Sequence, residues 1–385
     1  MVRFVHTADW QLGMARHFLD ADAQARFTAA RIDAVRRIGA LAAAERCDFV
    51  IVCGDVFESN HLSRQIVLRS LEAMAAVPVP VFLLPGNHDP LDASSIFRSE
   101  PFRTHQPTNV HVLEGGDPVE VGPGVAIVGA PWHSKRPGRD LVAAALADLA
   151  SDATPGVPSD GTLRILAGHG AVDVLSPDRT DQARIALGPA EAALAEGRID
   201  FVALGDRHSR TDVGASGRVW YPGAPEPTDF DEVDPGLALV VELGPGTCEV
   251  NAHEVGTWRF EEHRAALTGT ADVERLGLWF EALPAKERTA VRLSLIGTLG
   301  LADHAALLEL LDHQAQLLAS VQRWAKRSDL VVVPSDDDLG RLDLQGFAAR
   351  TCEELRSAVA SGGDDGAVAA DALALLHRLA SGRAA

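Results

Sequence analysis

The sequence predicts a layered α/β protein, and two features carry the prediction. Short apolar runs rich in Val, Ile, Leu and Phe alternate with helical patterns along the first two-thirds of the chain. Most of these runs are closed by Gly or Pro, which is typical of buried strands. Regular alternation of strands and helices favours a sheet that is covered by helices.

The elements follow in order along the chain. Strands are predicted at residues 2–5, 49–52, 81–84, 125–128, 163–166 and 201–204. Helices are predicted over about 21–46 and 63–76, because each places its apolar residues on one face. Turn-rich segments occur at 114–124, at 151–161 and in the acidic stretch that begins at Tyr221. The strands predicted at 237–243 and 247–254 are separated by Gly-Pro-Gly, which indicates a hairpin.

The composition changes near residue 257. Beyond it the pattern predicts a helix at 270–282, a strand at 291–296, a helix at 303–325 with Asp303 as its N-cap, and a strand at 330–333. Two amphipathic helices, at 345–360 and 367–380, follow around a glycine-rich break at 362–366. We therefore expect a core domain at 1–256, a small α/β domain at 257–342 and a helical segment at 343–385.

Composition excludes several classes of protein. With 46% hydrophobic and 23% charged residues, the 385-residue chain is globular rather than disordered or fibrous. Its net charge of −19 argues against coating nucleic acid by bulk charge, although a local basic groove is compatible with it. The four cysteines form no CxxC pair, and no signal peptide or membrane span is visible. These features predict a cytoplasmic protein without membrane contact.

Polar residues follow five of the predicted strands. The strand ends carry Asp9 and Gln11, then Gly54-Asp55, then Gly86-Asn87-His88-Asp89, then Gly168-His169-Gly170, and finally Gly205-Asp206-Arg207-His208. Ligand sites in open α/β sheets form beyond the carboxyl ends of strands. Carboxylate, imidazole and amide groups without thiolates indicate Mn²⁺, Fe, Zn²⁺ or Mg²⁺. Two such ions bridged by one carboxylate would suit displacement at phosphorus.

The series HTADWQLG, GDVFE, GNHD, GHG and GDRH resembles the calcineurin-like metallophosphoesterase superfamily. Within it, HTADWQLG resembles the SbcD-type DNA repair exonucleases, the nuclease subunits that work with an SMC-like coiled-coil ATPase. YPGAPEPTDFDE resembles the segment that closes their nuclease core. The resemblance covers residues 1–256 well. It implies a layered β-sandwich core flanked by helices, a small α/β capping domain and C-terminal helices.

The resemblance also implies a role for each strand-end residue. The first metal would be held by Asp9, Gln11, Asp55 and His208, and the second by Asp55 as a bridge with Asn87, His169 and Asp206. His88 would lie beside the scissile phosphate, stabilise the developing charge and help to protonate the leaving oxygen. Asp89 would orient this region. A hydroxide activated by the two metals would attack phosphorus.

Three positions depart from the family pattern. The family usually has histidine where this chain has Gln11 and Asp206, and some members place a histidine at the position of Glu58. Gln11 is a neutral, weak ligand, and the carboxylate of Asp206 favours harder ions. Two Mn²⁺ ions are therefore expected, with Mg²⁺ or Fe as alternatives. A decayed site without turnover is the competing interpretation.

Basic residues near these segments are candidates for substrate contacts. Arg207 and Arg210 flank a predicted ligand and would support a phosphate group. The loop with Lys135, Arg136 and Arg139 either contacts DNA phosphates or is simply solvated.

The favoured function is a metal-dependent phosphodiesterase acting on DNA, as the exonuclease or endonuclease subunit of a double-strand-break repair complex. Its partners would be DNA, the SMC-like ATPase and a second copy of the chain. The alternatives are a phosphoesterase for nucleotides or other small molecules and a non-catalytic DNA-end-binding subunit.

Overall fold

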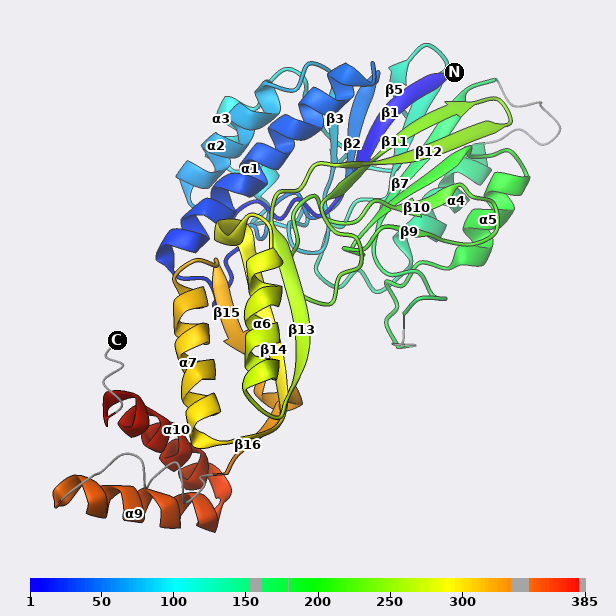
Figure 1. Ribbon diagram of the computed structural model, residues 1–385. Helices are drawn as coiled ribbons and strands as arrows, with labels where there is room; N and C mark the ends of the chain where they lie inside the picture. Colours follow the sequence, from blue (N-terminus) through cyan, green and yellow to red (C-terminus); the bar gives the residue numbers. More distant parts are fainter. Residues whose placement is uncertain (153–160, 177, 179, 334–345, 381–385) are drawn as a thin grey trace. The chain divides into compact units, whose positions relative to one another are not determined.

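The computed structural model describes residues 1–152, 161–176, 178, 180–333 and 346–380 (Figure 1). The chain forms two compact units. One comprises Met1–Arg16 with Gln24–Trp258, and the other comprises His17–Ala23 with Arg259–Ala385. The predicted boundary between residues 342 and 343 lies outside the described residues.

The first unit contains two six-stranded sheets. One has the spatial order β12 (Thr247–Glu254), β11 (Leu237–Gly244), β1 (Val2–Thr7), β2 (Phe49–Cys53), β3 (Val81–Leu84) and β4 (Val110–Val112). The other has the order β5 (Val119–Gly122), β6 (Val125–Gly129), β7 (Leu163–His169), β8 (Phe201–Gly205), β10 (Val219–Tyr221) and β9 (Thr211–Asp212). Strands β1 to β4 are mutually parallel, as are β6, β7, β8 and β10. Parallel pairing brings the carboxyl ends of these strands to one edge of each sheet.

The main core lies between the two sheets. Phe4 and Phe49 of the first sheet stack at 5.1 Å between ring centroids, and Phe201 of the second sheet meets Phe4 edge-on at 5.7 Å. The outer face of the first sheet packs on α1 (Ala21–Ala44), α2 (Arg64–Ala75) and α3 (Glu100–His105). The outer face of the second sheet packs on α4 (Leu141–Asp152) and α5 (Leu187–Ala195). The predicted α/β class, a layered β-sandwich flanked by helices, is confirmed.

The second unit is a small α/β structure. Its parallel strands are β13 (Arg259–Leu267), β14 (Thr289–Leu299), β15 (Ser320–Arg323) and β16 (Asp329–Val332). Leu293 and Leu295 of β14 pack with apolar residues of α6 (Thr270–Ala282) and α7 (Leu301–Ala315). Residues of α9 (Phe347–Ser361) and α10 (Gly363–Ala380) form a further cluster with α7.

Two predictions in this unit are wrong in extent. The helix predicted at 303–325 begins after Gly300 and ends at Ala315, and Asp303 lies in its first turn rather than at the N-cap. Val321 fits a helical period, yet it belongs to β15, where it pairs with Val291. The glycine-rich break is also shorter than predicted, since α10 already begins at Gly363. Its first-turn carboxylates favour a helix there because they complement the helix dipole.

A buried glutamate anchors the acidic segment 221–236. Glu226 is fully buried, accepts the backbone N–H groups of Thr257 and Trp258, and pairs with Arg37 at 2.6 Å. The buried guanidinium of Arg31 donates to the carbonyl of Pro227 at 2.9 Å. A buried carboxylate needs such partners, because it would otherwise be destabilising. These contacts fix the start of a segment that has little secondary structure of its own.

Candidate metal centre

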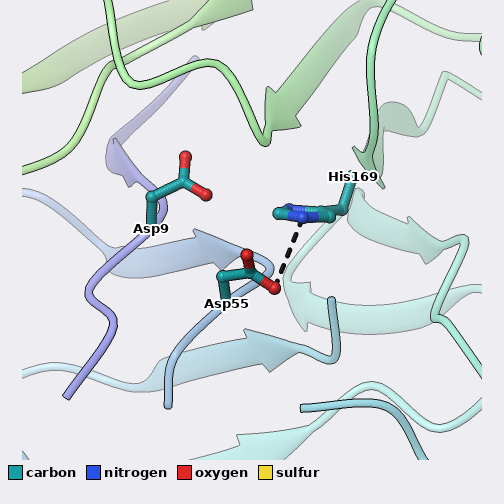
Figure 2. Close-up of side chains that lie close together, drawn as sticks. All are labelled: Asp9, Asp55 and His169. Carbon is teal, nitrogen blue, oxygen red and sulfur yellow. Dashed lines mark ion pairs between the residues drawn. The ribbon is translucent and has the colours of Figure 1, made fainter. Parts of the chain in front are cut away.

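The ends of β1 and β2 in one sheet and of β7 and β8 in the other meet at one edge of the sandwich. The N–H of Asp9 donates to the carbonyl of Gly54 at 3.1 Å, and the N–H of Gln11 donates to that of Asp55 at 2.8 Å. The N–H of Asp206 donates to the carboxylate of Asp9 at 3.1 Å, which links the two sheets. Figure 2 shows Asp9, Asp55 and His169 converging from separate strand ends. The predicted meeting of distant segments is therefore present.

Left-handed backbone conformations gather at these strand ends. In the described part of the chain, seven non-glycine residues have a positive φ, and four of them are predicted ligands: Asp9 (54°), Gln11 (42°), Asp55 (51°) and Asp206 (97°). Each such residue costs on the order of 1–3 kcal/mol, and such strain concentrates at functional sites. The left-handed conformation turns the backbone sharply after each strand, so that the side chain points into the cluster.

Two glycines permit the close approach of the strands. A Cβ at Gly205 would lie 1.8 Å from the carbonyl oxygen of Cys53, so no side chain fits there without moving backbone. Gly54 has φ +90°, and its Cβ would lie 2.0 Å from Nδ1 of His169. The sequence therefore requires glycine beside the ligand positions because backbone and imidazole occupy that space.

Asp9, Asp55 and His169 form the buried centre of the cluster. One ligand atom from each lies within 4.8 Å of the others. His169 donates its Nδ1–H to the carbonyl of Cys53 at 2.9 Å, so its Nε2 faces Asp55 Oδ1 at 3.4 Å. The side-chain amide of Asn87 lies 2.7 Å from the same Nε2, and Asp206 Oδ1 lies 3.8 Å from it. One imidazole nitrogen is thus surrounded by oxygen-bearing groups.

His208 approaches from the other side. Its Nε2 lies 3.9 Å from Asp9 Oδ1 and 3.4 Å from the Gln11 amide nitrogen. Its Nδ1 lies 3.0 Å from Glu232 Oε1 and 2.5 Å from Thr228 Oγ1. All seven predicted ligands therefore lie in one connected cluster. Their division between two ions stays a prediction.

The pKa shifts in the cluster arise from burial and from opposite charges that lie close together. Burial raises the pKa of Asp9 to about 7, although the two histidines oppose this shift. Burial alone would raise the pKa of Asp55 too, but the charge and hydrogen bond of His169 outweigh it and leave that pKa low. Burial would lower the pKa of His208, yet Glu232 and Asp9 raise it to about 9. Bound cations would take the place of the protons that these histidines hold.

The residues present fit divalent cations. Oε1 of Gln11 is buried and has no hydrogen-bond partner, which is unusual for a buried oxygen and is explained if it binds a cation. Both histidines use Nδ1 in hydrogen bonds, which leaves Nε2 for a metal. With the carboxylates of Asp9, Asp55 and Asp206, the donor set is rich in oxygen and free of thiolate, so it suits hard or intermediate ions.

The two residues predicted to act in catalysis occupy different surroundings. His88 has a side chain 39% exposed, its N–H donates to Asp55 Oδ1 at 2.9 Å, and its Nε2 lies 3.9 Å from Asp55 Oδ2. Its Nδ1 donates to the backbone carbonyl of Glu58 at 2.9 Å, which leaves Nε2 for contact with a substrate. Asp89 is fully buried and accepts the N–H groups of Gly86 and Phe57 at 2.7 and 2.9 Å. These contacts hold the turn and leave Asp89 no path to a substrate.

Two cavities border the cluster. One of about 650 Å³ is lined by Asn87 and Asp206 and also by Trp132, Lys135 and Arg136. The other, of about 430 Å³, is lined by Asp206, Arg207, His208 and Glu232. Arg207 thus lies at a cavity wall, whereas Arg210 pairs with Asp234 at 3.6 Å and lines neither cavity.

Sequence reasoning missed Glu232 and Thr228, which both contact His208. They lie in a turn-rich segment and not at a strand end, so the signal that identified the other residues is absent. The acidic composition of DFDE gave no means to tell a buried carboxylate from its exposed neighbours.

Comparison with known proteins identifies the family of the chain. The family model for calcineurin-like phosphoesterases matches residues 2–210, a span that contains all seven predicted ligands. The chain belongs to this family. Calcineurin-like phosphoesterases are hydrolases that use divalent metals, in agreement with the donor set described above. The match ends before Glu232.

Solved structures that match this chain include the TT1561 protein of Thermus thermophilus, with 10% identity, 66% of this chain and 99% of that chain covered, and a TM-score of 0.41. A dimetal phosphatase from Danio rerio shows 13% identity, 66% and 96% coverage, and a TM-score of 0.40. The comparison with curated proteins gave no significant match. None of the helices in the described ranges has the length and apolar character needed to cross a membrane.

Proposed function

We propose that this calcineurin-like phosphoesterase is a metal-dependent phosphodiesterase acting on DNA, as an exonuclease or endonuclease subunit in double-strand-break repair. The observation that carries the proposal is the cluster of seven ligand-type side chains centred on Asp9, Asp55 and His169. It lies beside a cavity that Lys135 and Arg136 line together with Asp178, Asp181 and Asp206. The choice of DNA rests on the resemblance of HTADWQLG and YPGAPEPTDFDE to SbcD-type nucleases.

Residues of the chain would bind the phosphates and transfer a proton. Lys135 and Arg136, which line the cavity with Asn87, would hold the phosphates that flank the reacting one. The exposed ring of His88 would carry a proton to the leaving oxygen, and its backbone N–H bond to Asp55 keeps it at the cluster. Two bound divalent ions would supply Lewis acidity and a nucleophile at neutral pH.

The donor set supports Mn²⁺ as the preferred ion. Asp206 adds a carboxylate where the family usually has an imidazole, and Gln11 adds a neutral oxygen. Hard oxygen donors favour Mn²⁺ and Mg²⁺ over Zn²⁺. A net charge of −19 is compatible with DNA as a substrate if the contacts are local, through bound metal ions and a few basic side chains.

The direct test compares DNA and nucleotide hydrolysis during a Mn²⁺ titration. Wild-type protein should cleave labelled DNA, and Asp55→Asn should lower the rate at least about a hundredfold, because it removes the proposed bridging charge. Asp48→Asn is the matched control, because Asp48 directly precedes β2. Within the described residues its side chain accepts a hydrogen bond from the N–H of Arg3. Turnover of nucleotides alone would identify a small-molecule phosphoesterase. Metal binding without any turnover would identify a non-catalytic subunit.

We also propose an SMC-like ATPase as partner and the cytoplasm as location, and exposed apolar residues on the C-terminal helices support the partner. Phe347, Val368 and Leu375 are 83%, 69% and 47% exposed, and apolar side chains on a helix pair suit docking against another helix. Phe347→Glu with Val368→Glu should abolish co-purification of the ATPase while leaving DNA cleavage intact. Undiminished co-purification would exclude these two side chains from the docking site. A homodimer is proposed from the family resemblance alone.

A further inference from the structure

We propose that Glu232 is a positioning residue, which holds the imidazole of His208 so that Nε2 faces Asp9 and Gln11. The inference rests on the proposed function in one respect, because it takes His208 to be a metal ligand. Glu232 lies outside the matched family region and carries no strand-end signal. Its role follows from its contacts.

The carboxylate of Glu232 contacts His208 directly. Its side chain is 5% exposed, and its Oε1 accepts the Nδ1–H of His208 at 3.0 Å. With Nδ1 engaged, the only remaining ring nitrogen is Nε2, which lies 3.9 Å from Asp9 Oδ1. A carboxylate in this position fixes the ring orientation and makes the free nitrogen a stronger ligand.

Glu232 is itself held in place. It accepts the N–H of Thr228 at 2.9 Å, the N–H of Asp229 at 3.1 Å and the hydroxyl hydrogen of Thr228. The Thr228 hydroxyl also lies 2.5 Å from Nδ1 of His208. These bonds close the 228–232 turn around the carboxylate, so Glu232 cannot swing away from the ring without breaking several hydrogen bonds.

The chain offers a matched control in Glu191. Its Oε1 accepts the N–H of Ala215 at 3.0 Å, and the N–H and hydroxyl of Ser216 at 3.3 and 3.1 Å. Glu191 thus closes a turn in the same unit as Glu232 does, but its described contacts include no histidine. A purely structural role for Glu232 predicts that both glutamates behave alike when replaced by glutamine.

The experiment is calorimetric titration of the full chain with Mn²⁺ alone. Wild-type protein should bind two ions. Glu232→Gln should weaken one of them about tenfold or more, the usual cost of losing such a partner, while Glu191→Gln leaves both unchanged. Glu232→Asp should recover part of the lost affinity. Equal binding by wild type and Glu232→Gln overturns the inference alone, whereas a wild type that binds no Mn²⁺ overturns the proposed function as well.

A second measurement needs no variant. In Zn²⁺-loaded protein with ¹⁵N-labelled histidine, the ring of His208 should show a protonated, hydrogen-bonded Nδ1 and a coordinated Nε2. This readout would remain decisive even if Glu232→Gln failed to fold. Coordination through Nδ1 would overturn the inference, because Glu232 could not then accept its hydrogen.

Discussion

His169 and His208 direct the same ring atom, Nε2, toward the cluster from two regions that are built differently. His169 ends β7, its side chain is fully buried, and its Nδ1 is held by the backbone carbonyl of Cys53. His208 lies on a loop, its side chain is 25% exposed, and its Nδ1 is held by the carboxylate of Glu232. One ligand is fixed by main chain and the other by side chain.

Different parts of the sequence therefore determine the surroundings of the two histidines. The surroundings of His169 depend on how closely the strands pack, so small residues at strand ends are decisive. The surroundings of His208 depend on the acidic segment 221–236, which the buried Glu226 ties to Arg37. Substitutions should therefore unfold the protein in the first region and weaken metal binding in the second.

The largest effect is expected from Gly205→Ala. A Cβ there meets the Cys53 carbonyl at 1.8 Å, so the strands must separate, and unfolding free energy should fall by about 3 kcal/mol or more. Urea denaturation measures this. Gly188→Ala in α5 is the control, because no atom lies within 4 Å of its added Cβ, and stability should stay within about 1 kcal/mol of wild type. If both variants lose the same stability, close backbone packing does not determine the region around His169.

The sequence predicts the first region well and the second poorly. Strand periodicity and the position of polar residues after each strand are local signals, so Asp9, Asp55 and His169 could be expected to converge. Glu232 and Thr228 reach His208 through a turn whose course depends on distant contacts such as Glu226 with Arg37. No local pattern encodes those contacts, and the roles of the ligands remain predictions.

The same limit explains the error in the second unit. Leu317, Leu318 and Val321 continue the helical period of α7, so the pattern alone extends the helix to residue 325. In the structure, pairing of β15 with β14 replaces the helical hydrogen bonds, and Trp324 lies over the guanidinium of Arg292 at 4.2 Å. Tertiary pairing outweighs local propensity here.

A pH-dependent effect of intermediate size is expected at His6, which contacts β8 in the same region as His169. Burial lowers the pKa of His6 to about 3, and its Nε2 donates to the carbonyl of Leu204 at 3.1 Å. Below a pH of about 6.5 His6 is protonated in the unfolded chain but stays neutral in the folded chain. The free energy of unfolding therefore decreases as the pH is lowered from about 6.5 toward 3.

The loss from His6 amounts to at most about 1.4 kcal/mol per pH unit. His6→Gln keeps a donor for Leu204 but cannot be protonated, and urea denaturation from pH 7 to pH 5 should show a shallower decline than wild type. His61→Gln replaces an exposed imidazole and should leave the slope unchanged. If His6→Gln loses stability between pH 7 and pH 5 as steeply as wild type, burial of His6 does not cause the decline.

The smallest effect tests whether the anchors of His169 are redundant. Trp132 donates its Nε1–H to the carbonyl of His169 at 2.8 Å, while the ring of His169 is held separately by Cys53. Trp132→Phe should lower stability by about 1 kcal/mol, as should Trp220→Phe, which loses a similar bond to Gly217. Mn²⁺ affinity should stay within about threefold of wild type in both. A tenfold loss confined to Trp132→Phe would mean that the bond from Trp132 to the carbonyl of His169, and not the bond from its ring to Cys53, sets the direction of Nε2.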